Sequence, residues 1–207
     1  MWIKVSLWHW QVVMWVLLTG TTAVAQQSTI PERLADKGVS LVSGMTIPSG
    51  PTPTLETILD DTDTVVRGIV GTPSTTLSAD QRHVQTDYPI RSAIVLHTAH
   101  LLDGDRPGAL PAVTVRVLGG TVEINGLTFT ETVEAMPSLE PGVECLFLLK
   151  REGNHYRLAG RFYGAFRILN DTLRPLVKKH GFASEQSGAS ATQTIAQMVA
   201  RLQKRPL

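Results

Sequence analysis

Glycine lies inside several segments whose other residues favour β-strands, and this feature most restricts the folds open to the chain. Gly68 lies in the middle of the segment TVVRGIVG, and Gly119-Gly120 interrupts an alternating valine segment. Gly160 and Gly164 occupy similar positions further along. A glycine inside a strand marks a bulge or a sharp bend. Such bends allow a small, strongly curved sheet to close on itself.

The segments around these glycines predict the individual strands, because they are rich in β-branched residues or alternate between apolar and polar residues. The predicted strands are 64–71, 90–102, 113–117, 143–150, 156–160 and 163–169. A polar loop is expected at about 72–87. Glu152-Gly153-Asn154 predicts a hairpin turn. The last two segments are expected to pair with each other.

Two helices are expected, one on each side of the strands. Thr54 can cap a short helix, and Ser190 with Gln193 forms a capping box at the start of the second. One face of the second helix carries an apolar stripe, formed by Ile195, Met198, Val199 and Leu202. This stripe either docks on the chain's own barrel or binds a partner, with residues 181–188 as a flexible tether.

The predicted fold is therefore mainly β, within the α+β class. It is a small, partly open antiparallel barrel of five or six strands, of the oligonucleotide/oligosaccharide-binding (OB) type. A short N-terminal helix and a C-terminal amphipathic helix flank it. The expected division is a signal peptide, a flexible linker, the barrel, a second linker and the C-terminal helix, at residues 1–25, 26–52, 53–175, 176–188 and 189–204.

The first 25 residues predict a secretory signal peptide. Lys4 precedes a mostly apolar run at 5–18, and Ala23-Val24-Ala25 has the small-x-small pattern that signal peptidase accepts. The run is shorter than the roughly 18–20 residues that span a bilayer. Cleavage before Gln26 is therefore favoured over an uncleaved membrane anchor, and export to the periplasm or the medium is expected without membrane attachment of the mature chain.

Composition narrows the class of protein. Hydrophobic residues make up 43% of the chain, which is enough for a globular core. The net charge is +1 without a basic patch, which argues against nucleic acid as a partner. Cys145 is the only cysteine and lies in a hydrophobic segment, so it is expected to be a small buried residue. The alternatives are a nucleophile or an intermolecular bridge, which would need a more positive and exposed setting.

The sequence contains no motif of a known catalytic class: no nucleophile elbow, metalloprotease helix, phosphate loop or dinucleotide fingerprint. His97 and His100 would point to opposite faces of a strand, so a metal shared by these two is not expected, and whether His83, His155 and His180 converge in space stays open. The acidic runs 60–63 and 103–105 do not have EF-hand spacing and are expected to be solvated loops. We therefore expect no enzyme, metal or cofactor, although paired carboxylates for glycoside chemistry depend on spatial distance and stay open.

Aromatic and arginine residues alternate near the end of the predicted barrel and suggest a binding face. Barrels of this type bind ligands on a strand face, and such mixtures suit sugars, peptides or single strands. The candidate ligand-binding residues are Tyr156, Arg157, Arg161, Tyr163 and Arg167. The alternative is that Tyr156 and Phe166 belong to the core and the arginines to the barrel exterior.

The order of segments over about 52–170 resembles a group of small exported bacterial proteins of uncharacterised function. The resemblance lies in Asp63 before Val65-Val66-Arg67-Gly68-Ile69-Val70, in 115–120, in Gly142-Val143-Glu144-Cys145-Leu146-Phe147-Leu148, and in Tyr156 with Gly164-Ala165-Phe166. The layout is also similar to the netrin-like barrels that include tissue inhibitors of metalloproteinases. Those inhibitors chelate zinc through an N-terminal cysteine, which the predicted N-terminus at Gln26 lacks. The resemblance thus implies fold, and fold does not determine function.

Three functions are consistent with these observations. The first is an exported, non-catalytic module that binds a protein or a cell-envelope component. The second is a proteinase inhibitor of netrin-like shape that acts through a barrel edge or loop. The third is a hydrolase whose active site cannot be recognised in the sequence. The oligomeric state is not predicted.

Overall fold

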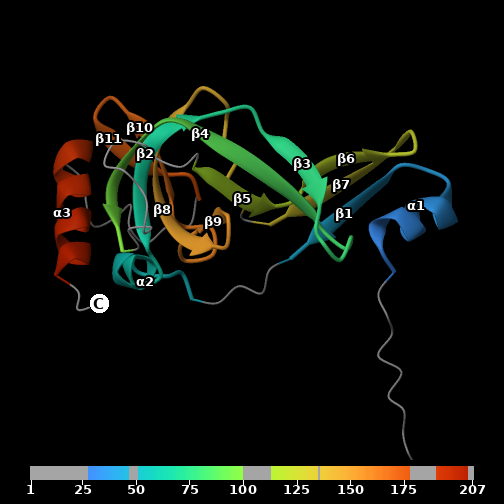
Figure 1. Cartoon of the computed structure of the whole chain (residues 1–207), viewed down its shortest axis with the longest axis horizontal. Coiled ribbons are helices and arrows are strands. Elements are labelled where there is room, and N and C mark those ends of the chain that lie inside the picture. Colours follow the sequence, from blue (N-terminus) through green and yellow to red (C-terminus); the bar gives the residue numbers. More distant parts are fainter. Residues whose placement is uncertain (1–27, 47–50, 100–112, 135, 178–189, 205–207) are drawn as a thin grey trace, which may run out of the picture.

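The computed structural model describes residues 28–46, 51–99, 113–134, 136–177 and 190–204. Within these ranges the protein is mainly β, with a closed five-stranded barrel at one end and a three-stranded sheet at the other (Figure 1). The barrel strands are β2 (Thr64–Val70), β4 (Val84–Thr98), β5 (Thr114–Leu118), β8 (Glu144–Glu152) and β9 (His155–Leu158).

The barrel closes because its strands form an unbroken ring. The order is β8-β2-β4-β5-β9, and β9 pairs again with β8 through a hairpin with the predicted turn at Gly153 and Asn154. All contacts are antiparallel except the one between β5 and β9, where Val115 lies opposite Tyr156. The predicted mainly β fold with a small barrel between two helices is therefore confirmed. The barrel is closed, where a partly open one was predicted, and it is compatible with the OB type.

Gly68 produces one of the bends on which the barrel depends. The register of β2 against β4 shifts between Arg67 and Ile69. A Cβ atom on Gly68 would lie 2.5 Å from Cγ2 of Ile90 and 3.0 Å from the carbonyl oxygen of Arg91. Only glycine allows β4 to approach so closely, which confirms the bend predicted at this position.

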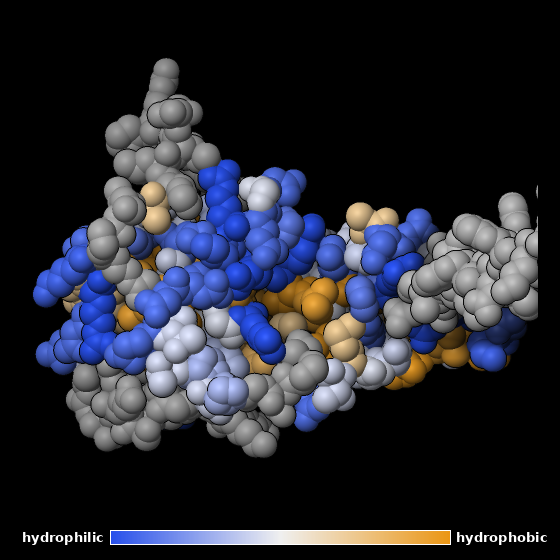
Figure 2. Space-filling view, turned by 90° about the horizontal axis from the view of Figure 1, so that it is seen from below, coloured by the Kyte–Doolittle hydropathy of each residue, from blue (hydrophilic) through white to orange (hydrophobic). Residues whose placement is uncertain are grey.

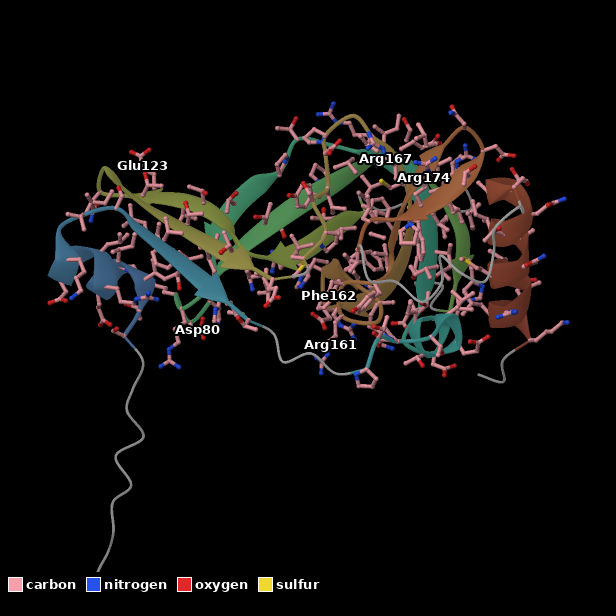
Figure 3. All side chains as sticks on the ribbon, turned by 180° about the vertical axis from the view of Figure 1, so that it is seen from behind. Asp80, Glu123, Arg161, Phe162, Arg167 and Arg174 are labelled. Carbon is pink, nitrogen blue, oxygen red and sulfur yellow. The ribbon has the colours of Figure 1, made fainter. Side chains whose placement is uncertain are left out.

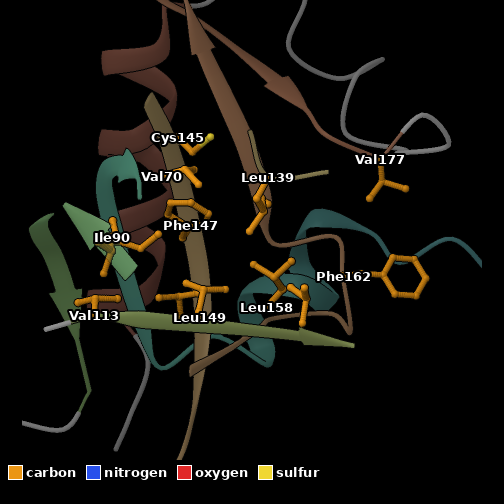
Figure 4. Packing of buried hydrophobic residues seen from close by; sticks show 14 residues of the cluster. Val70, Ile90, Val113, Leu139, Cys145, Phe147, Leu149, Leu158, Phe162 and Val177 are labelled. Carbon is orange, nitrogen blue, oxygen red and sulfur yellow. The ribbon is translucent and has the colours of Figure 1, made fainter. Parts of the chain in front are cut away.

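The interior of the barrel is filled by side chains from all five strands (Figure 4). Phe147 and Leu149 of β8 are fully buried, together with Val66 of β2, Val115 of β5 and Leu158 of β9. Cys145 belongs to the same cluster and is 1% exposed, which confirms the expected small buried residue.

Two helices cover the outside of the barrel. Helix α2 (Leu55–Asp60) begins after Thr54, and α3 (Ala191–Gln203) begins after Ser190 with the predicted capping box. Together they bury a second hydrophobic cluster against β2, β8 and β10 (Ala165–Leu169), the strand that pairs with β8. Its members include Ile58, Val65, Leu146, Leu148, Phe166, Met198 and Leu202. The apolar stripe of α3 thus docks on the chain's own barrel.

Strands β10 (Ala165–Leu169) and β11 (Thr172–Pro175) form a hairpin that extends the sheet beside β8. The expected pairing of 156–160 with 163–169 is wrong, because β9 and β10 both pair with β8 instead of with each other. The two strands share one edge of β8, and they meet at Leu148. Its N–H donates to Gly164 and its carbonyl accepts from Ala159.

A second structural unit, which we call the wing, consists of α1 (Ile30–Lys37), β1 (Leu41–Met45), β6 (Gly120–Ile124) and β7 (Leu127–Val133). Its sheet has the order β1-β7-β6. Helix α1 covers one face, where Ile30 and Leu34 pack with Phe129. Strand β3 (Ser74–Leu77) pairs with β4, whose 15 residues link the barrel to this end of the molecule (Figure 1).

The main departures from the predicted secondary structure lie in the wing and in the strands β3 and β4. The segment 26–52 was expected to be a linker, but α1 and β1 form within it. The polar loop expected at 72–87 contains β3 and the start of β4. Strand β4 accordingly begins before the predicted 90–102 segment. The predicted signal peptide, and nearly all of the predicted linker 176–188, lie outside the described residues.

Candidate functional site

The five residues predicted to bind a ligand do not gather on one surface. Tyr156 and Tyr163 are partly buried and pack against the barrel core. Arg161 lies beside Phe162 near one end of the barrel, whereas Arg167 lies near Arg174 on the β10–β11 hairpin (Figure 3). They are separated because β9 and β10 follow each other along β8 instead of forming one hairpin.

Arg157, the remaining candidate, belongs to a charged network at one end of the barrel. Its guanidinium donates to both carboxylate oxygens of Asp61, at 2.7 and 2.9 Å, and to Glu152 at 2.7 Å. Asp61 also accepts the N–H of Gly160 at 2.8 Å. These bonds join the end of α2 to the β8–β9 hairpin, so Arg157 has a structural role.

The same network determines the charge state of Asp61. Burial tends to raise the pKa of this carboxyl group, but it is outweighed. The hydrogen bonds from Arg157 and Gly160, with the positive charges of Arg157 and Lys150, lower the pKa below its usual value. Asp63 pairs with Lys150 at 2.8 Å. The run 60–63 was expected to be a solvated loop, but these two carboxylates stabilise the corner before β2.

Arg167 and Arg174 are directly opposite each other on β10 and β11. Like charges in this position destabilise a strand pair. An ion pair between Arg167 and Glu140 at 3.4 Å offsets this repulsion in part. A second pair of positive side chains lies at the candidate residue Arg157, which is opposite Lys150 on β8.

Cys145 is unsuited to nucleophilic chemistry. Burial raises the pKa of its thiol to about 12, so the reactive thiolate is scarce at neutral pH. Burial also lowers the pKa of His97, which favours its neutral form. Among the described residues, no group of three or more histidines, cysteines and carboxylates could hold a metal ion. His100 and the acidic run 103–105 lie outside those residues.

One buried carboxylate lies in the wing. Glu131 of β7 is 5% exposed and accepts hydrogen bonds from the N–H of Val84 at 2.6 Å and from Nδ1 of His83 at 3.1 Å. Val84 is the first residue of β4, and His83 is the residue before it. Glu131 therefore ties the wing to β4, and its oxygens are engaged in that link.

The open edge of β1 is the feature most suited to binding. In the described part of the chain, β1 pairs only with β7, in parallel. Its sequence LVSGM contains no charge and no proline, the residues that usually protect an edge from further pairing. Val42 is 79% exposed, and Val39 just before the strand is 55% exposed.

The backbone of β1 shows which groups are open. The carbonyl of Met45 accepts the N–H of Glu134, so Met45 faces β7. Because the backbone groups of successive residues in a strand point to opposite edges, Leu41 and Ser43 also face β7. The N–H and C=O groups of Val42 and Gly44 therefore point away from the sheet. Sequence reasoning missed this edge because it placed no strand in the segment.

The open face of the wing sheet, opposite α1, carries threonines next to Val42. Val42 lies opposite Thr130, which lies opposite Thr121 on β6, and the two threonine hydroxyls are 3.0 Å apart. In the view of Figure 2, hydrophobic residues gather in the middle of the molecule and along one side of the end that holds the wing. The rest of the visible, described surface is largely hydrophilic.

Comparison with known proteins gives no relative from which a function can be transferred: no family model, curated protein or solved structure matches the chain. Among the described helices, none has both the length and the apolar character needed to cross a membrane.

Proposed function

We propose that this protein is an exported, non-catalytic binding module that recognises another polypeptide by adding its strand to the open edge of β1. Export is inferred from Lys4, the apolar run 5–18 and the Ala23-Val24-Ala25 pattern. The partner is a protein, in the medium or the cell envelope, that presents an extended segment.

The observation that carries this proposal is the unprotected edge itself. Extended peptides add to such edges through main-chain hydrogen bonds, and side-chain pockets supply specificity. Val42 and Gly44 present the free backbone groups, and the exposed side chain of Val42 offers an apolar contact beside them. The barrel, by contrast, has no open edge among its five strands.

The experiment compares partner capture by the wild type and by a variant with a blocked edge. Gly44→Pro removes an N–H that points away from the wing, so it leaves the pairing with β7 intact, and proline is tolerated on such edges. Ile94→Lys is the control, because Ile94 is an exposed β-branched residue of β4 in the barrel, 56% exposed. Each protein, from Gln26 onward, is immobilised and exposed to envelope extract and culture supernatant.

We expect a protein, identified by mass spectrometry, to be retained by the wild type and by Ile94→Lys but not by Gly44→Pro. Circular dichroism checks that all three are folded. Retention that is the same for all three would move the binding site away from β1. An absence of retained protein on every column would contradict the proposed function.

A further inference from the structure

We infer that the strand accepted by β1 is β1 of a second copy, so that two molecules pair about a two-fold axis. This inference rests on the proposed function, because it names the partner of the same edge. It follows from the pattern of backbone groups, side chains and charges along five residues.

The backbone pattern of β1 is self-complementary. Its outward groups belong to Val42 and Gly44, which flank Ser43. An antiparallel pair centred on Ser43 places Val42 of one copy opposite Gly44 of the other, and the reverse. Both residues then form a hydrogen-bonded pair in which each donates and accepts. All outward N–H and C=O groups of the two residues are thus satisfied.

The side chains fit this register. Val42 projects from the open face and is 79% exposed, while Gly44, on the same face, has no side chain. Among the described residues, a Cβ atom at Gly44 would make one ordinary contact, with Oγ1 of Thr132 at 3.8 Å, so nothing there obstructs a neighbouring side chain. In the paired arrangement, the valine of each copy lies beside the glycine of the other and is shielded from water.

The residues of β1 and its neighbours in the sequence carry no charges that would repel a second copy. No residue from 38 to 55 is charged, so neither the strand nor the residues next to it repel their equivalents. The nearest preceding charges, Asp36 and Lys37, form an ion pair with each other at 3.5 Å. Proteins that must remain single usually place a charge on such an edge.

The expected result is one continuous sheet of six strands, made from the three strands of each wing. The contact is small, because a stable interface buries about 800 Å² from each partner and a five-residue strand supplies less. We therefore expect association that depends on concentration, observable between micromolar and millimolar protein.

The test measures self-association of the purified chain from Gln26 onward by analytical ultracentrifugation across that range. Gly44→Pro removes two of the hydrogen bonds across the axis and should weaken association about 30-fold. Val42→Lys should weaken it roughly tenfold or more, through the lost apolar contact. Ile94→Lys, with the same type of substitution on the barrel, should associate like the wild type.

Amide hydrogen exchange locates the contact in the same samples. Exchange at Val42 and Gly44 should slow as concentration rises, whereas exchange at Ser43, whose N–H already faces β7, should change little. A dimer that persists in both edge variants, or a wild type that stays monomeric up to millimolar concentration, would overturn the inference. A monomeric protein that still captures a different protein through β1 would leave the proposed function standing, which separates the two failures.

Discussion

The barrel and the wing differ in how they treat the edges of their sheets. In the barrel, β9 returns to β8 and pairs with β5, so that its five strands leave no edge. In the wing, the three-stranded sheet has β6 at one edge and β1 at the other, and β1 has no charge, proline or bulge to protect it. The comparison separates a part of the molecule that is complete by itself from a part that is suited to pairing.

The two regions also differ in whether the packing around a strand requires a glycine. Gly68 in the barrel is required by close approach, since any side chain would collide with Ile90 and the backbone of Arg91. A Cβ atom at Gly44 in the wing would instead make an ordinary contact, at 3.8 Å from Oγ1 of Thr132. A side chain at this position would fit the fold of a single copy, so the glycine is consistent with a role in an interface.

The largest effects should come from the two cores. Phe147 in the barrel and Phe129 in the wing are both fully buried, and replacing either by alanine should cost about 3–5 kcal/mol of the stability of its region. Phe147→Ala should lower the free energy of global unfolding in urea. Phe129→Ala should mainly speed amide exchange in the wing. Equal loss of protection in barrel and wing with Phe129→Ala would show that they unfold as one unit.

The second-largest effect on stability is expected from replacing Gly68 of the barrel. Gly68→Ala should destabilise the protein by about 1–3 kcal/mol, because the new Cβ would lie 2.5 Å from Cγ2 of Ile90. Gly44→Ala is the matched control and should change stability by about 0.5 kcal/mol or less. Urea unfolding of both variants measures the difference. Similar values for the two would show that the barrel can shift to accept a side chain, and would weaken the contrast between the regions.

The third effect is a dependence on pH that belongs to the barrel. The pKa of Asp61 is lowered in the folded protein, so its stabilising contribution is present above the ordinary carboxyl pKa and is lost as pH falls through the lower, folded value. Asp61→Asn should cost about 1–3 kcal/mol at neutral pH, from weakened bonds to Arg157 and Gly160.

Urea unfolding at neutral pH and at acidic pH tests this prediction. The difference between wild type and Asp61→Asn should shrink in acid, because the wild-type carboxyl group is then protonated. Glu56→Gln is the control, since Glu56 pairs with Arg201 on the exposed surface and should contribute little at either pH. A difference between wild type and Asp61→Asn that is unchanged in acid would contradict the role of Asp61.

The sequence predicted the barrel better than the wing, for physical reasons. The barrel strands carry strong hydrophobic patterns, and Gly68, Thr54 and Ser190 each determine local structure that can be recognised from neighbouring residues. The start of α1 has a similar signal in the capping box of Thr29 and Glu32, but the surrounding segment is rich in proline, serine and threonine, a composition that predicts a linker.

Long-range pairing explains most of the remaining errors. Strand β1 is only five residues long, and its partner β7 lies almost ninety residues further on, as with Leu41 and Phe129. Nothing next to β1 in the sequence indicates that pairing. The candidate ligand-binding residues lie apart for the same reason: β9 and β10 share the edge of β8, which their own sequences do not reveal.

The smallest effect on stability is expected from a substitution at Val42, on the open edge of β1. Val42→Lys should change the free energy of unfolding at low concentration by about 0.5 kcal/mol or less, because the side chain is 79% exposed. Val65→Lys, at a fully buried valine under the helices of the barrel, should prevent stable folding. Thermal unfolding of dilute protein compares them. If Val42→Lys were instead strongly destabilising, the valine would belong to the fold of the single copy. If it is neutral there but weakens association, the exposed valine is explained by pairing and not by stability.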